Sequence, residues 1–120
     1  MRGINTVVIM GRLGKSLESK QTVTGKTYVD LQIATNRPIK QNDIWTESTD
    51  WHQVRFWGKQ ADTCCKYLEK GTLVAIEGSL KTDQWTSEDG NKQFRTYVLG
   101  QQVHLLPKKH GQLKGLLPLK

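Results

Sequence analysis

The chain has 120 residues, which is enough for one domain with a single hydrophobic core but leaves no room for a second folded domain. Eighteen lysines and arginines against eleven acidic residues give a net charge of +7, a balance that fits either polyanion binding or a merely basic surface. The apolar fraction of 36% is low and indicates a thin core with a large surface, as in a small barrel or sandwich.

Cysteine usage and hydropathy indicate a soluble protein of a reducing compartment, which we take to be the cytoplasm. Cys64 and Cys65 are adjacent, and neighbouring residues do not readily reach disulfide geometry. No apolar stretch approaches the ~18 residues of a membrane span, and Arg2-Gly3 leads directly into a strand-like run instead of a signal peptide. We therefore expect no membrane association.

Three strands and a polar segment are expected before residue 49. The β-branched run 4–10 predicts a strand that is largely covered on both sides and ends at Gly11. Residues 17–23 are a weaker, polar strand candidate. Residues 27–35 alternate cleanly and predict a half-buried strand, whereas the polar segment 38–48 indicates a loop or an extended hairpin.

The central strand, residues 51–57, has two chemically different faces. A period of two residues places His52, Val54 and Phe56 on one side. The other side carries Trp51, Gln53, Arg55 and Trp57. A dry core does not accommodate unpaired Gln and Arg side chains, so we expect this second face to lie outward.

One helix and two strands complete the predicted order of elements. Apolar residues at helical spacing predict a helix over 60–70 in which the cysteines are buried, and Gly71 follows its end. Strands are expected at 73–80 and 94–106, joined by a turn at 87–91. The fold class is therefore all-β with one helix, a five-stranded oligonucleotide-binding barrel over residues 1–106. A basic flexible tail is expected at 107–120.

No arrangement of residues predicts catalysis, a cofactor or a metal site. Gly14-Lys15-Ser16 and Gly25-Lys26-Thr27 both imitate the end of a phosphate-binding P-loop, but the glycine that should precede each by five positions is missing. The histidines lack ligand spacing to the cysteines. We expect no enzyme activity.

The tryptophans are the candidate binding residues. On the outward face of the central strand, Trp51 and Trp57 beside Arg55 offer stacking platforms for bases and a cation for phosphate. The alternative for each indole is a place in the core. Trp45 and Trp85 lie at hairpin positions, where they either contact DNA or clasp the hairpin.

A set of ordered motifs resembles the bacterial and mitochondrial single-stranded DNA-binding proteins. The matches run from about Gly3 to Val103 and include Gly3-Ile4-Asn5-Thr6-Val7, Ile33-Ala34-Thr35, Asp50-Trp51-His52-Gln53-Val54, Phe56-Trp57-Gly58-Lys59, Tyr67-Leu68-Glu69-Lys70-Gly71 and Ile76-Glu77-Gly78-Ser79-Leu80. The resemblance implies an oligonucleotide-binding barrel that coats unpaired DNA during replication, recombination and repair without catalysis, usually as a homotetramer.

The resemblance also implies roles for particular residues. Stacking on bases is expected from Trp51, Trp57 and Trp85. A contact that relatives make with a tryptophan at the position of Ile39 is either weakened here or passes to Trp45. Lys59, Lys70 and Lys81 match basic positions along the family's DNA path, and we also expect phosphate contacts from Arg2, Lys40 and Arg55. Subunit contacts are expected at Asn5, Val7 and His52.

Two departures from the family pattern keep alternatives open. Asp83-Gln84 stands where a basic pair is common in the family. Members of the family also usually end in a short acidic tip that recruits replication and repair proteins. Here no acidic residue follows Asp89, so recruitment by that route is in doubt. A dimeric primosomal replication-restart protein on the same barrel is the alternative function. A barrel that serves only protein interactions is a third.

Overall fold

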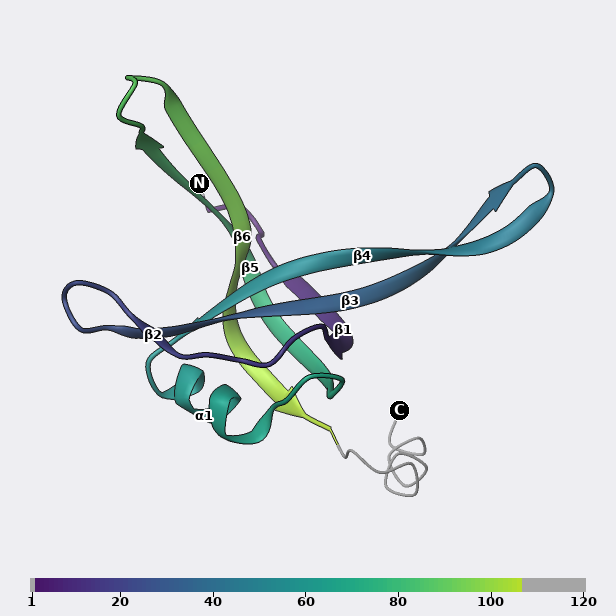
Figure 1. The fold of residues 1–120 in the computed structure, drawn as a ribbon, viewed down its shortest axis with the longest axis horizontal. Coiled ribbons are helices and arrows are strands. Elements are labelled where there is room, and N and C mark those ends of the chain that lie inside the picture. Colours follow the sequence, from purple (N-terminus) through teal and green to yellow (C-terminus); the bar gives the residue numbers. More distant parts are fainter. Residues whose placement is uncertain (1, 107–120) are drawn as a thin grey trace.

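The computed structural model describes residues 2–106, which form six strands and one helix (Figure 1). In chain order these are β1 Val7–Leu13, β2 Lys20–Gln21, β3 Thr27–Gln41, β4 Ile44–Trp57, α1 Lys59–Tyr67, β5 Leu73–Thr86 and β6 Lys92–Leu105. The tail expected at 107–120 lies outside the described residues.

Five of the strands close into a barrel. They are hydrogen-bonded in the order β1-β5-β6-β4-β3, and β3 pairs back with β1 to complete the circle. The pairing of β4 with β6 is parallel and the others are antiparallel. With α1 between β4 and β5, this arrangement confirms the predicted oligonucleotide-binding barrel. The weak strand candidate at 17–23 is reduced to β2, a two-residue addition to the edge of β3.

Alternate side chains of the strands fill the barrel. The fully buried side chains are Val29, Leu31, Ile33, Val54, Phe56, Val74, Ile76 and Cys64. The ring of Phe56 lies against Gly100 on β6, where a Cβ atom would come within 2.4 Å of the ring. Gly100 also adjoins a β-bulge, because the β5–β6 register shifts by one residue between Glu77 and Gly78. The core therefore depends on a close backbone approach to one aromatic ring.

The first strand differs from the prediction in position and in burial. It begins at Val7 and passes through Gly11 to Leu13, and Val8 and Met10 on its outer side are exposed in the single chain. The expectation of cover on both faces is therefore wrong for this chain. Pairing with β5 begins at Val7 because the side-chain amide of Asn5 already bonds both the N–H and the C=O of Leu80, at 2.8 Å each.

β3 and β4 form a long hairpin that extends from the barrel (Figure 1). β3 was predicted to end before Asn36 but continues to Gln41, so the polar segment is the extended hairpin and not a loop. Asn42 and Asp43 form its turn with φ values of 51° and 63°, the left-handed conformation that a two-residue hairpin turn requires. Proline has no backbone N–H to donate to a neighbouring strand. Pro38 is tolerated because at this end of the hairpin β3 pairs only with β4.

The β5–β6 hairpin is a second arm (Figure 1). β5 runs to Thr86 instead of ending at Leu80, and its register with β6 is continuous from Gly78 to the turn. The predicted turn at 87–91 is confirmed, with Gly90 at φ 85°. The alternation of the sequence did not reveal the true end of β5, because most side chains on both sides of the projecting arm are exposed and no buried face marks its length.

The helix closes one end of the barrel and buries a cysteine. α1 ends at Tyr67, three residues before the predicted end, and Leu68 is already extended. Cys64 is buried and Cys65 partly buried, as expected, and burial raises the pKa of the Cys64 thiol to about 12. Within residues 2–106 no helix is long and apolar enough to cross a membrane.

Candidate nucleic-acid interface

One face of the β3–β4 hairpin carries three tryptophans. Trp45, Trp51 and Trp57 follow each other at six-residue intervals on β4, so they leave the same side of the strand about 20 Å apart. Trp45 is 65% exposed and Trp51 59%, whereas Trp57 is partly buried. Val54 and Phe56 point into the barrel, so the predicted division of β4 into two faces is confirmed.

Trp51 lies over the chain segment that follows β1. A Cβ atom at Gly14 would be 2.2 Å from Cζ3 of the indole, so only glycine allows the ring to lie there. The backbone N–H of Gly14 bonds the carbonyl of Gln32 at 2.9 Å, which fixes this segment against β3. One edge of the indole is therefore held while most of the ring stays open to solvent.

Trp57 belongs to a cluster of aromatic rings around Arg55. The ring centroids of Trp57 and Tyr28 are 5.1 Å apart and tilted by 44°. The guanidinium of Arg55 lies over the rings of Tyr28 and Tyr97 and makes two hydrogen bonds to Asp30. Arg55 was predicted to contact phosphate, but in the structure its side chain is largely covered and committed to this carboxylate.

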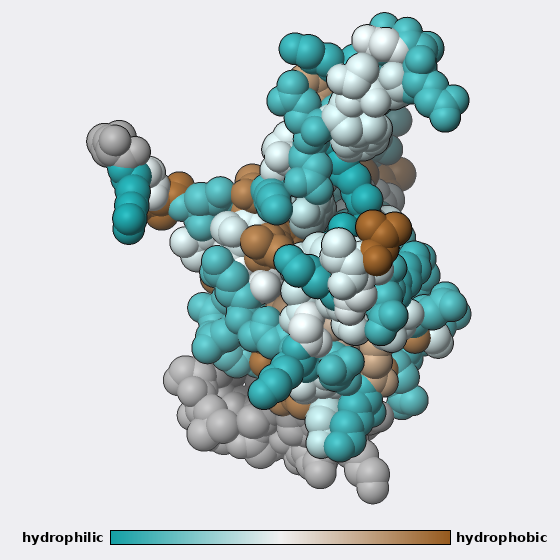
Figure 2. All heavy atoms as spheres, turned by 90° about the vertical axis from the view of Figure 1, so that its left-hand side faces the viewer, coloured by the Kyte–Doolittle hydropathy of each residue, from teal (hydrophilic) through white to brown (hydrophobic). Residues whose placement is uncertain are grey.

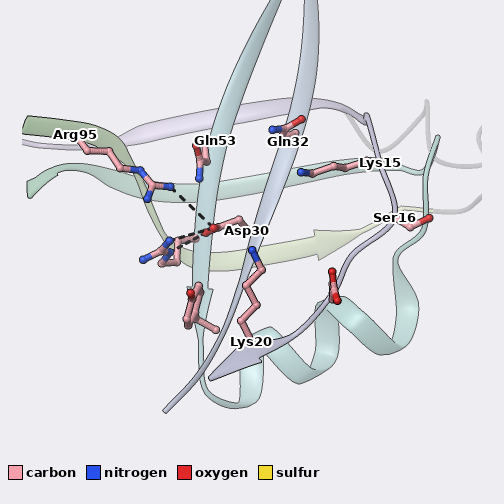
Figure 3. A pocket seen from close by; sticks show the side chains of 10 residues that line it. Lys15, Ser16, Lys20, Asp30, Gln32, Gln53 and Arg95 are labelled. Atoms are coloured by element: carbon pink, nitrogen blue, oxygen red, sulfur yellow. Dashed lines mark hydrogen bonds and ion pairs between the residues drawn. The ribbon is translucent and has the colours of Figure 1, made fainter. Parts of the chain in front are cut away.

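A polar hollow of about 430 Å³ lies beside this cluster (Figure 3). Its floor is formed by side chains of β3 and β4, including the cross-strand neighbours Gln32 and Gln53. Lys15 and Lys20 enter it from the segment between β1 and β3, and Arg95 from β6. The hollow thus combines cations with amides that donate and accept hydrogen bonds, and the carboxylates of Glu18 and Asp30 also line it.

Trp85 extends the same surface onto the second hairpin. On β5, Lys81, Asp83 and Trp85 share a side, and their partners on β6 are Tyr97, Arg95 and Gln93. Tyr97 also lies against Arg55, so this side of the arm is continuous with the aromatic cluster. Burial, together with a hydrogen bond to Asp83, raises the pKa of the Tyr97 hydroxyl. Trp85 itself is 48% exposed.

One predicted phosphate-binding lysine lies beside an exposed indole, and two others are related to the indoles through the backbone. Lys40 is the cross-strand partner of Trp45, with Nζ 5.7 Å from the ring centroid. Lys59 begins α1, two residues after Trp57. Lys70 precedes Gly71, whose N–H bonds the carbonyl of Leu13 at 2.9 Å beside the Trp51 site. Of these three lysines, Lys40 is the one whose ammonium group lies over an indole ring.

Two acidic side chains partly offset the positive charge of these lysines, and Arg2 lies outside the strands that carry the indoles. Lys40 Nζ is 3.9 Å from Asp43, and Lys81 Nζ is 3.9 Å from Asp83. Arg2 is exposed ahead of β1. The side of the molecule in Figure 2 is mostly hydrophilic, with its hydrophobic side chains in small separate patches.

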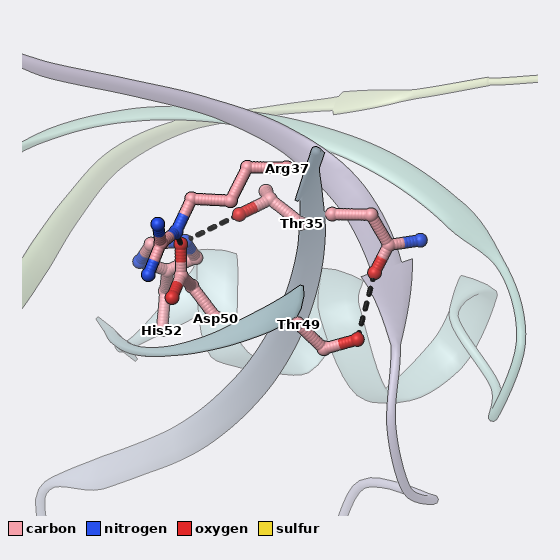
Figure 4. Close-up of polar contacts among 6 residues, drawn as sticks. Thr35, Arg37, Thr49, Asp50 and His52 are labelled. Carbon is pink, nitrogen blue, oxygen red and sulfur yellow. Dashed lines mark hydrogen bonds and ion pairs between the residues drawn. The ribbon is translucent and has the colours of Figure 1, made fainter. Parts of the chain in front are cut away.

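The residues predicted at subunit contacts make contacts within this chain. His52 Nε2 is 2.8 Å from the hydroxyl of Thr35, next to the Arg37–Asp50 ion pair of 2.9 Å (Figure 4). Asn5 holds Leu80, as described above, and Val7 packs against the core. Val8, not Val7, points outward from β1.

Four residues of the central cluster were not predicted from the sequence: Tyr28, Asp30, Arg95 and Tyr97. A signal for two of them existed, since Tyr28 and Asp30 alternate with the buried Val29 and Leu31. Their proximity to Arg55 follows from the β3–β4 register, which pairs Asp30 with Arg55. No cluster of three or more metal-binding side chains occurs in the part of the chain that the structure describes.

Comparison with known proteins identifies the family. Residues 4–106 match the Single-strand binding protein family. The chain belongs to this family. It is 36% identical over 110 residues to Single-stranded DNA-binding protein 1 of Chlorobaculum tepidum, covering 90% of this chain and 68% of that protein. It is 37% identical to the single-stranded DNA-binding protein of Xylella fastidiosa, covering 88% of this chain and 65% of that protein.

Solved structures of the family share the barrel. The single-stranded DNA binding protein from Thermus aquaticus superposes with a TM-score of 0.77 at 30% identity, covering 92% of this chain and 54% of that one. The Plasmodium falciparum SSB complex with ssDNA gives a TM-score of 0.75 at 23% identity, covering 89% of this chain and 98% of that one, and shows the same fold. The resemblance inferred from sequence motifs is therefore confirmed.

Proposed function

We propose that this chain binds and coats single-stranded DNA with little sequence preference during DNA replication, recombination and repair. The observation that carries this proposal is the row of indoles on one side of β4, joined through Tyr97 to Trp85 and accompanied by lysines. Every base has a π face, so such a row accepts any sequence. Its relatives' names as single-stranded DNA-binding proteins support the assignment.

The proposed activity is binding alone, without catalysis, in the cytoplasm beside the nucleoid. Bases stack on Trp45, Trp51, Trp57 and Trp85, while phosphates meet the neighbouring lysines. In a duplex the faces of the bases are already stacked on each other, so these platforms cannot receive them.

The experiment that tests this proposal is a titration of intrinsic tryptophan fluorescence with oligo-dT and with a duplex of equal length. Stacking on exposed indoles should quench the emission with oligo-dT, and duplex should bind much more weakly at the same moderate salt concentration. Equal affinity for the two would show a generic basic surface. A protein-interaction module would bind neither.

Replacing Lys59 with alanine should weaken binding modestly for every sequence. If Lys59 contacts one phosphate, the slope of log affinity against log salt should become shallower by about 0.7, because fewer counterions are released from the single strand. Oligo-dT titrations at four salt concentrations measure this slope. Lys66→Ala is the matched control, since Lys66 lies in the last turn of α1. An identical change in the control would refute the assigned contact.

Replacing Gly14 with alanine should weaken DNA binding by about 1 kcal/mol, through displacement of Trp51. The added methyl group would lie 2.2 Å from Cζ3, so the indole must leave its place over this segment and lose its fixed orientation. Gly3→Ala is the control, because no heavy atom lies within 4 Å of the position of its Cβ. Unchanged affinity in Gly14→Ala would separate Trp51 from the binding surface.

We further propose that the chain forms a homotetramer. The outer side of β1, with exposed Val8 and Met10, and the neighbourhood of Asn5, Val7 and His52 are the proposed contact regions. Sedimentation at micromolar concentration tests this assembly. A stable dimer would favour the replication-restart alternative, and a monomer would exclude both assemblies.

A further inference from the structure

Arg55 occupies the centre of the proposed DNA-binding face but is paired with a carboxylate of the neighbouring strand. Its Nε and one terminal nitrogen donate hydrogen bonds of 2.7 and 3.0 Å to the two oxygens of Asp30. Asp30 lies opposite Arg55 in the β3–β4 register, so the backbone presets this bidentate pair. The hydrogen bond to Asp30 is the main reason that the pKa of Arg55 is raised.

The same guanidinium contacts three aromatic rings from three strands. Its carbon lies 4.3 Å from the ring centroid of Tyr28, 5.3 Å from that of Tyr97 and 5.8 Å from that of Trp57. These distances are within the range of cation–π attraction. One guanidinium therefore contacts aromatic rings from β3, β4 and β6.

This environment does not suit a phosphate ligand. Only 14% of the Arg55 side chain is exposed, and the negative charge of Asp30 opposes the approach of a second anion. Arg95, 39% exposed, is the more accessible guanidinium beside the hollow, with one nitrogen 4.0 Å from Asp30. The cation with the most aromatic contacts is therefore poorly placed for DNA phosphate.

We propose that Arg55 is a positioning residue: oriented by Asp30, it holds the rings of Trp57 and Tyr28 in the arrangement that receives a base, and it contacts no phosphate. This inference rests on the proposed binding of single-stranded DNA. A platform that is already ordered binds more tightly, because little side-chain freedom is lost when the base arrives. The Asp30–Arg55 pair supplies that order without adding net charge to the face.

The decisive variant is the double substitution Asp30→Asn with Arg55→Gln. It removes one positive and one negative charge, so the net charge of +7 is unchanged, and the two amides can still bond each other. We expect oligo-dT affinity to fall about tenfold with the salt slope unchanged. In a Trp57→Ala background the same two substitutions should reduce the affinity by clearly less than about tenfold, because one of the two rings that Arg55 positions is gone.

A single substitution, Arg55→Lys, gives an independent measurement that keeps the charge. An ammonium group cannot make the bidentate contact or lie flat between rings, so we expect about a fivefold loss of affinity at every salt concentration. A phosphate-binding role predicts nearly wild-type affinity for this variant. If the double variant does not fold, Arg55→Lys decides between the two roles.

Three other results would overturn the proposal. A salt slope shallower by about 0.7 in the double variant, with equal losses with and without Trp57, would assign Arg55 to a phosphate. A lowered melting temperature with unchanged DNA affinity would assign the pair to stability alone. Wild-type affinity for oligo-dT in both the double variant and Arg55→Lys would show that Arg55 has no role in DNA binding. Failure of the wild-type protein to bind oligo-dT would instead refute the proposed function.

Discussion

Replacing Trp51 with alanine is expected to weaken binding of single-stranded DNA by about 1 to 3 kcal/mol, roughly the contribution of one stacked base. Trp51 is the exposed indole nearest the barrel on β4, and its edge rests on Gly14, so its orientation is set before DNA arrives. The salt slope should remain as in the wild type, because an indole releases no counterion. Fluorescence and anisotropy titrations with oligo-dT measure both quantities.

Tyr67→Ala controls for the loss of an exposed aromatic ring. Tyr67 is exposed at the end of α1, outside the row of indoles, and its removal should leave DNA affinity unchanged. Melting temperatures should change little in either variant, since neither ring is buried. If Trp51→Ala melted earlier and bound DNA normally, Trp51 would be a structural residue and the proposed face would be wrong.

Replacing Phe56 with alanine is expected to destabilise the fold by about 3 to 5 kcal/mol, the cost of emptying a buried aromatic site. Phe56 is fully buried, and its ring fills the space left by Gly100 on β6. A domain of this size is stable by only about 5 to 15 kcal/mol, so the loss is a large part of the total. Urea unfolding at fixed protein concentration measures it.

Phe94→Ala is the matched control for that experiment. Phe94 lies on the projecting part of β6 and is exposed, so the same chemical change should alter stability by less than about 0.5 kcal/mol. Comparable destabilisation by both substitutions would contradict the assignment of Phe56 to the barrel interior. Together with Trp51→Ala, this pair tests the two faces of β4 by separate measurements.

The sequence by itself determined the class of fold and the division of the central strand. Each is a local property: strand and helix follow from the period of apolar residues, and alternation from Trp51 to Trp57 assigns every side chain to a face. Ordered motifs over most of the chain determined the family, which the comparison confirmed. These inferences needed no knowledge of which segments meet in space.

Tertiary structure decided the lengths of the two arms. Hydrogen bonding between β3 and β4 continues for the whole hairpin although no hydrophobic face continues with it, so pairing and not periodicity sets the strand ends. The same holds for β5 beyond Leu80. Alternation reveals a strand only where one side is buried.

Tertiary structure also decided which neighbours the charged and small residues contact. Arg55 looks like a phosphate ligand in sequence, but the register places Asp30 opposite it and Tyr28, Tyr97 and Trp57 around it. Gly14 looks like an ordinary turn residue, yet Trp51, distant in sequence, occupies the space of its missing side chain. Such contacts arise from barrel closure. Closure pairs β1 with β3 and β6 with β4, and so brings residues that are distant in sequence to the two edges of the β3–β4 hairpin.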